Sequence, residues 1–165
     1  MARRAPGAAG TRPLRRRDRR RDRDGPRGLG VSRRPGGRIY LDTCVLIYAV
    51  ESADARGDVV RDRLARTPSS LVVSPLVAME ALVGPIRSGD IEIRDRYVAV
   101  LGLLDVVELP MPVFLRAAEL RASTGLRTPD ALHLAAAQVH GCAALWTNDD
   151  RLAAASRGLA LNVLA

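Results

Sequence analysis

From residue 38 to residue 165, short apolar runs alternate with longer amphipathic segments, and this alternation constrains the fold more than any other feature of the chain. The expected strands cover 38–42, 70–74, 106–109, 143–147 and 161–164. The expected helices cover 43–51, 56–66, 75–83, 91–104, 112–124 and 128–141, with a short helix after residue 149. Strands that alternate with helices form a parallel sheet covered on both faces. The sequence therefore predicts an α/β fold, a three-layer sandwich with a central parallel sheet of four to five strands flanked by helices.

Two of the expected helix boundaries depend on proline. Gly84 and Pro85 are expected to end the helix that begins at Pro75, because proline lacks the N–H that continues a helix. Thr128 is expected to be the N-cap of the next-to-last helix, with Pro129 at its first helical position. This arrangement would place Asp130 two residues after the cap.

The first 37 residues differ in composition from the rest of the chain. They contain 13 of the 26 arginines but only 3 of the 18 acidic residues, a net charge of +10, so that 38–165 carries −2. A segment dominated by Arg, Gly and Pro cannot bury enough apolar surface to offset its ordering entropy. We therefore expect a disordered extension over 1–37 and one folded domain over 38–165. Two interpretations of the extension stay open: an electrostatic arm for nucleic acid, or translation from a start codon placed upstream of the true start, for which Val31 is the candidate.

Residue types that the sequence lacks exclude several classes of protein. The chain contains no lysine, which excludes P-loop NTPases and enzymes that form a Schiff base. Its two cysteines, Cys44 and Cys142, are too few for a disulfide framework. No apolar run reaches the roughly 18–20 residues that a membrane span needs. We expect a cytoplasmic protein with no membrane association.

Acidic residues stand at positions where a parallel sheet binds ligands, which is at the carboxyl ends of its strands. Asp42 ends the first expected strand, Asp149 follows the fourth, and Asp130 lies at the start of a helix. Each aspartate also has a purely structural interpretation, because aspartate caps helices and favours their first turn. The sequence alone leaves both interpretations open.

Glu80 is different because it interrupts an otherwise apolar helix in PLVAMEALVGP. A carboxylate buried there without a partner would cost several kcal/mol, so a metal ion or an arginine is expected beside it. Carboxylates that converge on one cleft repel one another unless a cation neutralises them. An all-oxygen site of this kind suits Mg²⁺ or Mn²⁺, ions that assist phosphodiester hydrolysis.

Four blocks of sequence, LDTCVLIYAVE, SPLVAMEAL, TPDALHLAAA and TND, together resemble a PIN domain. Within that family they are most similar to the VapC-type toxin ribonucleases of bacterial type II toxin–antitoxin pairs. The resemblance covers 38–165 and implies a PIN-like nuclease domain. It implies an endoribonuclease that depends on Mg²⁺ or Mn²⁺, acts on an RNA substrate, forms a homodimer and is inhibited by a cognate antitoxin protein.

The resemblance also implies roles for particular residues. The catalytic, metal-binding acids would be Asp42, Glu80, Asp130 and Asp149. Thr43 and Thr147 match small hydroxyl positions beside the metal site, and His133 is expected to be structural. Apart from the resemblance, Arg121 and Arg127 flank the Asp130 helix, where they could hold RNA phosphates or pair with Glu119.

A second function from another class fits the same sequence. The protein could be a non-catalytic, RNA-binding PIN-like protein that acts through its basic N-terminal segment. The presence of all four acids argues against this alternative, because a scaffold has no reason to keep a cluster of mutually repelling carboxylates.

Overall fold

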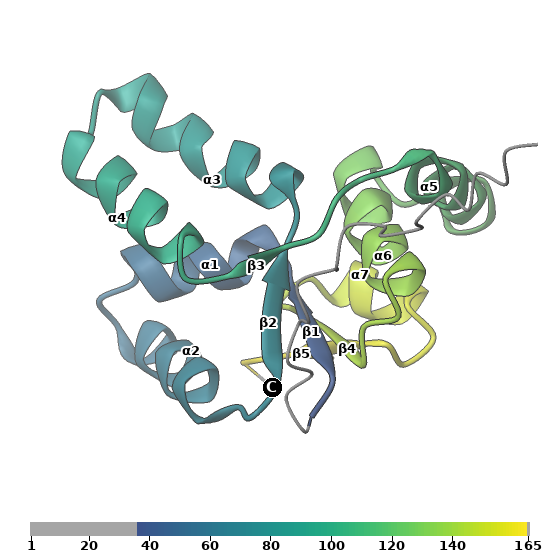
Figure 1. Cartoon of the computed structure of the whole chain (residues 1–165), viewed down its shortest axis with the longest axis horizontal. Helices are drawn as coiled ribbons and strands as arrows, with labels where there is room; N and C mark the ends of the chain where they lie inside the picture. The colour runs from purple at the N-terminus through teal and green to yellow at the C-terminus, as the bar shows by residue number, and fades with distance from the viewer. Residues whose placement is uncertain (1–35, 165) are drawn as a thin grey trace, which may run out of the picture. The chain divides into compact units, whose positions relative to one another are not determined.

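Five parallel strands form the central sheet of the computed structural model, which describes residues 36–164 (Figure 1). The strands are β1 (Arg38–Leu41), β2 (Ser70–Val73), β3 (Asp105–Val106), β4 (Ala144–Thr147) and β5 (Ala160–Asn162), in the spatial order β3-β2-β1-β4-β5. The predicted parallel α/β sheet is confirmed. The disordered extension expected over 1–37 lies, except for its last two residues, outside the described part of the chain.

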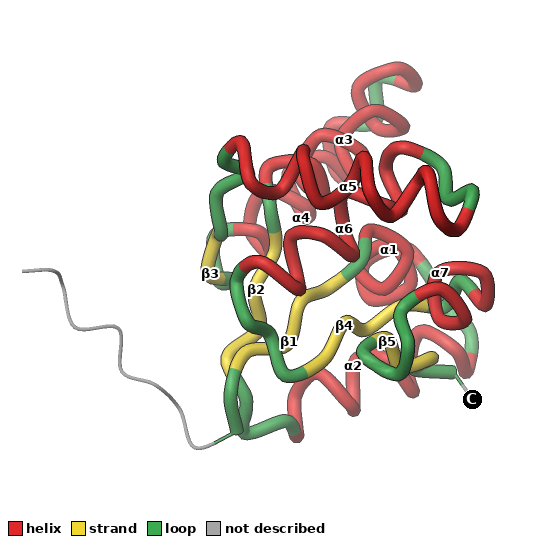
Figure 2. The backbone as a smooth tube through the Cα atoms, turned by 90° about the vertical axis from the view of Figure 1, so that its right-hand side faces the viewer, coloured by secondary structure: helices red, strands yellow, loops and turns green. Residues whose placement is uncertain are grey.

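Helices cover both faces of this sheet. They are α1 (Thr43–Glu51), α2 (Ala55–Arg66), α3 (Pro75–Ser88), α4 (Ile91–Leu101), α5 (Met111–Thr124), α6 (Thr128–Val139) and α7 (Asp150–Ala155). Figure 1 shows α1–α4 on one side of the sheet and α5–α7 on the other, and Figure 2 views the strands from the α5–α7 side. The three-layer arrangement is thus as predicted. Among the described residues, no helix is both long enough and apolar enough to cross a bilayer.

The core follows from the position of β1 at the centre of the sheet. Tyr40 and Leu41 are both buried although their side chains leave opposite faces of the strand. On the α5–α7 side, α6 presents a buried face rich in alanine, with Ala131, Leu134 and Ala135 fully buried. Small side chains let α6 approach the sheet closely, which brings its first turn to the carboxyl edge of β1 and β4.

The helix α3 does not end at Gly84 and Pro85, so that prediction was wrong. Pro85 removes one backbone hydrogen bond, but its buried side chain continues the face begun by Val77 and Ala81. Packing of this buried face therefore stabilises the helix enough for it to continue past Pro85. The helix ends instead at Gly89, which adopts a left-handed conformation with φ 71°.

The expected strand over 106–109 was also misplaced. The observed strand is only Asp105–Val106, because its partner β2 ends at Val73 and leaves 108–109 nothing with which to pair. The cap of α6 is Arg127 rather than Thr128, which is itself the first helical residue. Asp130 is consequently the third residue of α6, one position deeper in the first turn than expected.

Two glycines of the domain allow a matched test of packing. A Cβ on Gly57, in α2, would lie 2.2 Å from the backbone oxygen of Ser52, whereas a Cβ on Gly84, in α3, would meet nothing within 4 Å. We expect Gly57→Ala to destabilise the domain by about 3 kcal/mol, because backbone must move. Gly84→Ala is expected to stabilise it by about 0.5–1 kcal/mol through reduced backbone entropy. Chemical denaturation measures both changes, and equal effects would contradict the described packing of α2.

Candidate active site

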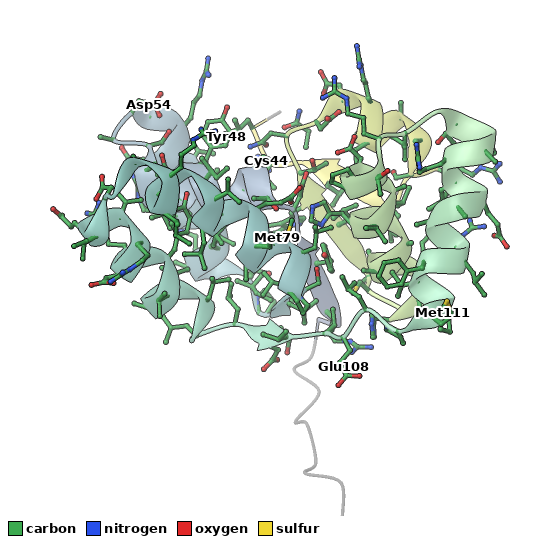
Figure 3. All side chains as sticks on the ribbon, turned by 90° about the horizontal axis from the view of Figure 1, so that it is seen from above. Cys44, Tyr48, Asp54, Met79, Glu108 and Met111 are labelled. Atoms are coloured by element: carbon green, nitrogen blue, oxygen red, sulfur yellow. The ribbon has the colours of Figure 1, made fainter. Side chains whose placement is uncertain are left out.

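The candidate site lies where the chain order of the sheet reverses. β1 and β4 are neighbours, yet the chain runs from β1 towards β2 on one side and from β4 towards β5 on the other. In open parallel sheets such a switch point is the usual position of a ligand site. Asp42 and Asp149 follow these two strands. Figure 3 looks down on this edge, with Cys44 near the middle between the two groups of helices.

The side chain of Asp42 is buried and is held by a residue from the neighbouring strand. Its Oδ2 accepts a hydrogen bond of 2.6 Å from the Thr147 hydroxyl and a longer one of 3.3 Å from the Cys44 thiol. Asp42 occupies the N-cap position of α1, but its side chain caps no backbone N–H. The capping interpretation of Asp42 is therefore not supported, and its carboxylate is directed towards the switch point instead.

Cys44 acts as a neutral donor in this arrangement. Burial, and then the charge of the Asp42 carboxylate, raise the pKa of the Cys44 thiol to about 12. A thiol with so high a pKa carries almost no thiolate near neutral pH. Cys44 is thus unsuited to nucleophilic catalysis.

Asp149 has the structural role that sequence reasoning left open. Its Oδ1 accepts hydrogen bonds from the backbone N–H groups of Arg151 and Leu152, at 2.7 and 3.1 Å, and so caps α7. Its own backbone N–H donates to the Thr147 hydroxyl at 3.0 Å. Within residues 36–164, its second carboxylate oxygen takes part in no hydrogen bond. Capping fixes the side chain and leaves that oxygen available for a ligand.

The pKa of Asp130 depends on the carboxylates of the other two aspartates. Burial raises the pKa of its carboxyl group, and the carboxylates of Asp149 and Asp42 raise it further, while His133 and Arg127 act in the opposite direction. A raised pKa means that the folded protein disfavours the ionised form of Asp130. The carboxylates of Asp42 and Asp149, which follow β1 and β4, thus act electrostatically on Asp130 at the start of α6.

Glu80 lies on α3 and reaches the same edge with partners that sequence reasoning missed. Its Oε2 accepts hydrogen bonds from the Thr43 hydroxyl at 2.5 Å and from His133 Nε2 at 2.9 Å. Burial alone would raise the pKa of Glu80, but these two hydrogen bonds and the attraction of His133 lower it below its usual value. We expected a metal ion or an arginine as its partner; the described residues provide a threonine and a histidine.

His133 is the centre of a buried chain of hydrogen bonds. Its Nδ1 lies 3.0 Å from the Tyr40 hydroxyl, which in turn lies 2.6 Å from Ser74 Oγ. Its Nε2 also lies 3.6 Å from Asp42 Oδ1. His133 is buried as a structural histidine should be, but it contacts two candidate catalytic acids, which was not expected. One feature of the sequence could have revealed the contact between His133 and Glu80. The Glu80 carboxylate interrupts an apolar helix, so it needs a hydrogen-bond donor from another element.

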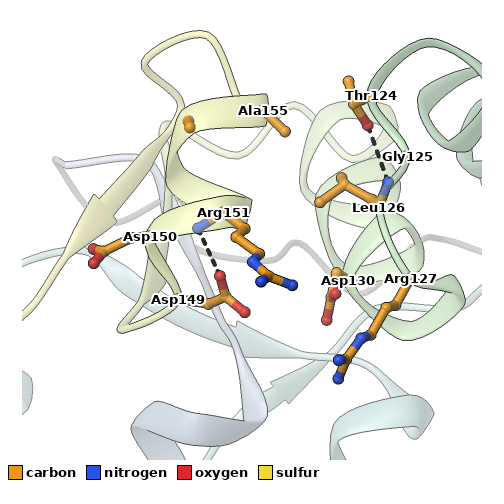
Figure 4. Close-up of a pocket in the computed structure, with 10 residues that line it drawn as sticks. Thr124, Gly125, Leu126, Arg127, Asp130, Asp149, Asp150, Arg151 and Ala155 are labelled. Atoms are coloured by element: carbon orange, nitrogen blue, oxygen red, sulfur yellow. Dashed lines mark hydrogen bonds between the residues drawn. The ribbon is translucent and has the colours of Figure 1, made fainter.

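Arg121 lies outside the cleft that completes the site. The Arg121 Nε donates to the Leu126 carbonyl at 3.3 Å, which places this side chain on the turn between α5 and α6. Beyond that turn is a cleft of about 720 Å³. Figure 4 shows that Asp130 and Asp149 stand on its two walls. Two of the four candidate acids are thus open to a space large enough for a nucleotide-sized ligand.

The donor chemistry of these acids fits a divalent ion. Within residues 36–164, no group of three or more acidic, histidine or cysteine side chains is already arranged to hold a metal ion. The groups present are nevertheless carboxylate oxygens, the ligands that Mg²⁺ and Mn²⁺ prefer. The repulsion that raises the pKa of Asp130 is the kind that a bound cation would relieve.

Solved structures share this architecture. A toxin–antitoxin complex from Klebsiella pneumoniae superposes with a TM-score of 0.64 at 23% identity, covering 76% of this chain and 97% of that one. VapBC2 from Rickettsia felis, bound to a DNA fragment from its promoter, gives 0.64 at 19% identity, covering 76% and 98%. The sarcin–ricin-loop-cleaving toxin VapC20 from Mycobacterium tuberculosis gives 0.62 at 19%, covering 71% and 94%.

At these identities the likeness concerns the fold, and no curated protein matches the sequence significantly. The family model for the PIN domain, in contrast, matches residues 39–158. This range contains β1 except for its first residue, all four candidate acids and the hydrogen bonds that orient them. The chain therefore belongs to the PIN domain family.

Proposed function

We propose that this protein is a metal-dependent endoribonuclease and the toxin of a type II toxin–antitoxin pair. Membership of the PIN family and the likeness to toxin–antitoxin complexes support a toxin nuclease. One observation carries the proposal: at the switch point of the sheet, burial and the carboxylates of Asp149 and Asp42 all disfavour the ionised form of Asp130. Such a cluster is useful when it holds a cation.

Four side chains of the chain would hold that cation, and others would orient them. A divalent ion bound by Asp42, Glu80, Asp130 and Asp149 would activate water and stabilise the negative charge that develops at the scissile phosphate. The Thr147 hydroxyl fixes Asp42, and the Thr43 hydroxyl together with His133 fixes Glu80. The backbone of α7 fixes Asp149. Orientation of this kind keeps the carboxylates in place despite their repulsion.

The experiment that tests the function separates catalysis from helix capping. Asp149 and Asp90 are both N-cap aspartates that accept backbone hydrogen bonds, but Asp90 caps α4, away from the other acids. Because asparagine caps nearly as well as aspartate, both Asp→Asn variants should fold. We expect the wild type and Asp90→Asn to cut total RNA with Mg²⁺ or Mn²⁺ and not with EDTA, and Asp149→Asn to lose at least about tenfold in rate.

The chemistry of the product ends supplies a second criterion. Attack of water on the scissile phosphorus with departure of the 3′ oxygen is expected to leave a 5′-phosphate and a 3′-hydroxyl. No cyclic phosphate forms, because the ribose 2′-hydroxyl takes no part. Chemical analysis of the fragment ends identifies these groups directly, and sequencing of the fragments locates the cleavage sites in the target RNA. A 2′,3′-cyclic phosphate, or cleavage that continues in EDTA, would contradict the mechanism.

The antitoxin has a candidate binding groove on the other side of the sheet. A cleft of about 630 Å³ between α1, α2 and α4 is mostly apolar, with Arg61 and Arg96 at its rim and Leu103, 85% exposed, at its edge. We assign it to an apolar segment of the cognate antitoxin, since the similar folds include toxin–antitoxin complexes. We expect Leu103→Glu to weaken antitoxin binding by at least tenfold in calorimetry, about 1.4 kcal/mol, with RNA cleavage unchanged. Unchanged affinity would place the antitoxin elsewhere.

A second copy of the chain has a candidate contact on α3. Met79, Val83 and Ile86 are more than half exposed and follow one another at spacings that place them on one helix face. An exposed apolar stripe of this kind is typical of an interface. We propose that it pairs two copies in the homodimer, and light scattering of the purified protein should give twice the mass of 17.8 kDa. A monomer at micromolar concentration would contradict it.

A further inference from the structure

Most arginines of the described domain are already bound to groups of their own chain. Hydrogen bonds or ion pairs to described carbonyls and carboxylates occupy Arg38, Arg61, Arg66, Arg94, Arg116 and Arg121, and Arg63 also has an interaction. The remaining arginines are Arg56, Arg87, Arg96, Arg127, Arg151 and Arg157, and of these only Arg127 and Arg151 line the cleft that holds Asp130 and Asp149. In the part of the chain that the structure describes, neither guanidinium has a hydrogen bond or an ion pair, and both residues are exposed.

These two arginines stand in the cleft that holds Asp130 and Asp149. Arg127 comes from the wall formed by the α5–α6 turn, and Arg151 from the opposite wall at the start of α7 (Figure 4). The backbone fixes the position of each arginine relative to one of the two aspartates. Arg127 is the N-cap of the helix that carries Asp130, and the backbone N–H of Arg151 donates to Asp149. No other arginine lines the cleft among residues 36–164.

The charge of the domain limits how it can attract RNA. Residues 38–165 carry a net charge of −2, so the folded domain as a whole does not attract a polyanion. Attraction must come from a local group of arginines, and a guanidinium that is not already paired is the one able to take a phosphate. A cleft of about 720 Å³ has room for a nucleotide between the two walls.

We propose that Arg127 and Arg151 bind backbone phosphates of the RNA strand beside the bond that is cleaved, and so position that bond against the acids. This inference rests on the proposed function, to which it adds the residues that hold the substrate. The two arginines are positioning residues: they grip phosphates that stay intact. They also offset the repulsion that the carboxylates of Asp130 and Asp149 would exert on the strand.

The test compares two double variants that remove equal charge from the full-length protein. Arg127→Gln/Arg151→Gln empties the cleft of arginine, whereas Arg66→Gln/Arg94→Gln removes two exposed arginines of α2 and α4, which do not line it. We expect the cleft variant to raise KM for RNA at least tenfold with kcat within about threefold, and the control variant to change neither. The N-terminal segment is present in every variant, so its own affinity for RNA cancels in the comparison.

Binding is measured separately from turnover. In an Asp42→Asn background, fluorescence anisotropy with a labelled oligouridylate gives Kd as a function of salt. Loss of two phosphate contacts should reduce the slope of log Kd against log salt by about 1.4, at 0.7 for each contact with a single strand. Arg127→Lys/Arg151→Lys should restore most of the slope, because lysine keeps the charge. A role of these arginines in folding alone would leave the slope unchanged.

The outcomes distinguish the inference from the proposed function. If the wild type cuts RNA and the cleft variant keeps its KM and salt slope, the inference is overturned and the nuclease stands. If both double variants weaken binding equally, general charge explains the effect and the inference is again overturned. If no RNA is cut but the cleft variant alone loses affinity and slope, the inference stands and the nuclease proposal fails.

Discussion

His133→Ala is expected to lower the free energy of unfolding by about 3–5 kcal/mol, because it removes both hydrogen bonds of a buried histidine at once. Glu80 would lose a donor to a partly buried carboxylate, and Tyr40 would lose one of the two partners of its buried hydroxyl. A cavity would also remain beside the sheet. Urea denaturation followed by circular dichroism measures the change.

His140 supplies the matched control. It is the only other histidine of the chain, lies at the end of the same helix, and makes one hydrogen bond of 2.7 Å from its ring to the Glu108 carbonyl. Because it is partly exposed, water can replace that bond, so His140→Ala should cost no more than about 1 kcal/mol. Equal losses in the two variants would mean that the buried network around Glu80 does not stabilise the domain.

Asp130→Asn is expected to act in opposite directions on activity and on stability. Cleavage of RNA should fall at least a hundredfold, since a proposed ligand loses its charge. The metal-free protein, in contrast, should melt about 1–3 °C higher. The sign follows from the raised pKa of Asp130: burial and the carboxylates of Asp149 and Asp42 disfavour its ionised form in the folded state, and asparagine removes that unfavourable charge.

Calorimetry in EDTA and a cleavage assay in Mg²⁺ measure the two effects on the same preparations. Asp58→Asn serves as the control, because Asp58 is an exposed carboxylate in the first turn of α2 that pairs with Arg61. That variant should keep its activity and gain no stability. If Asp130→Asn lost stability as well as activity, the carboxylate would be a structural group of the α6 first turn rather than part of a strained site.

The positions of the aspartates could be predicted because they depend on local sequence. Asp42 directly follows one apolar strand and Asp149 lies two residues after another, and the carboxyl ends of parallel strands meet at one edge of a sheet. Whether an aspartate caps its helix could not be predicted from position alone. Asp149 caps α7 through its side chain, whereas Asp42 stands in the same position of α1 and bonds to Thr147 from another strand.

What could not be predicted depends on contacts between distant segments. The bond between Glu80 and His133 joins residues 53 positions apart, and no local pattern specifies it. The passage of α3 through Pro85 depends on the packing of a buried face, and the short β3 depends on where β2 ends. Arg121 and Arg127 are similar in sequence context, but only Arg127 lines the cleft, because the turn after α5 directs Arg121 to a carbonyl.

The most direct test of the central claim is a calorimetric titration of the metal-free, full-length protein with Mn²⁺ and then Mg²⁺. If the four acids form a cation site, the wild type should bind the ion saturably, and Asp130→Asn should bind it at least tenfold more weakly while remaining folded. A folded wild type that binds neither ion, or equal affinity in the variant, would contradict the claim that these carboxylates hold the metal that drives cleavage.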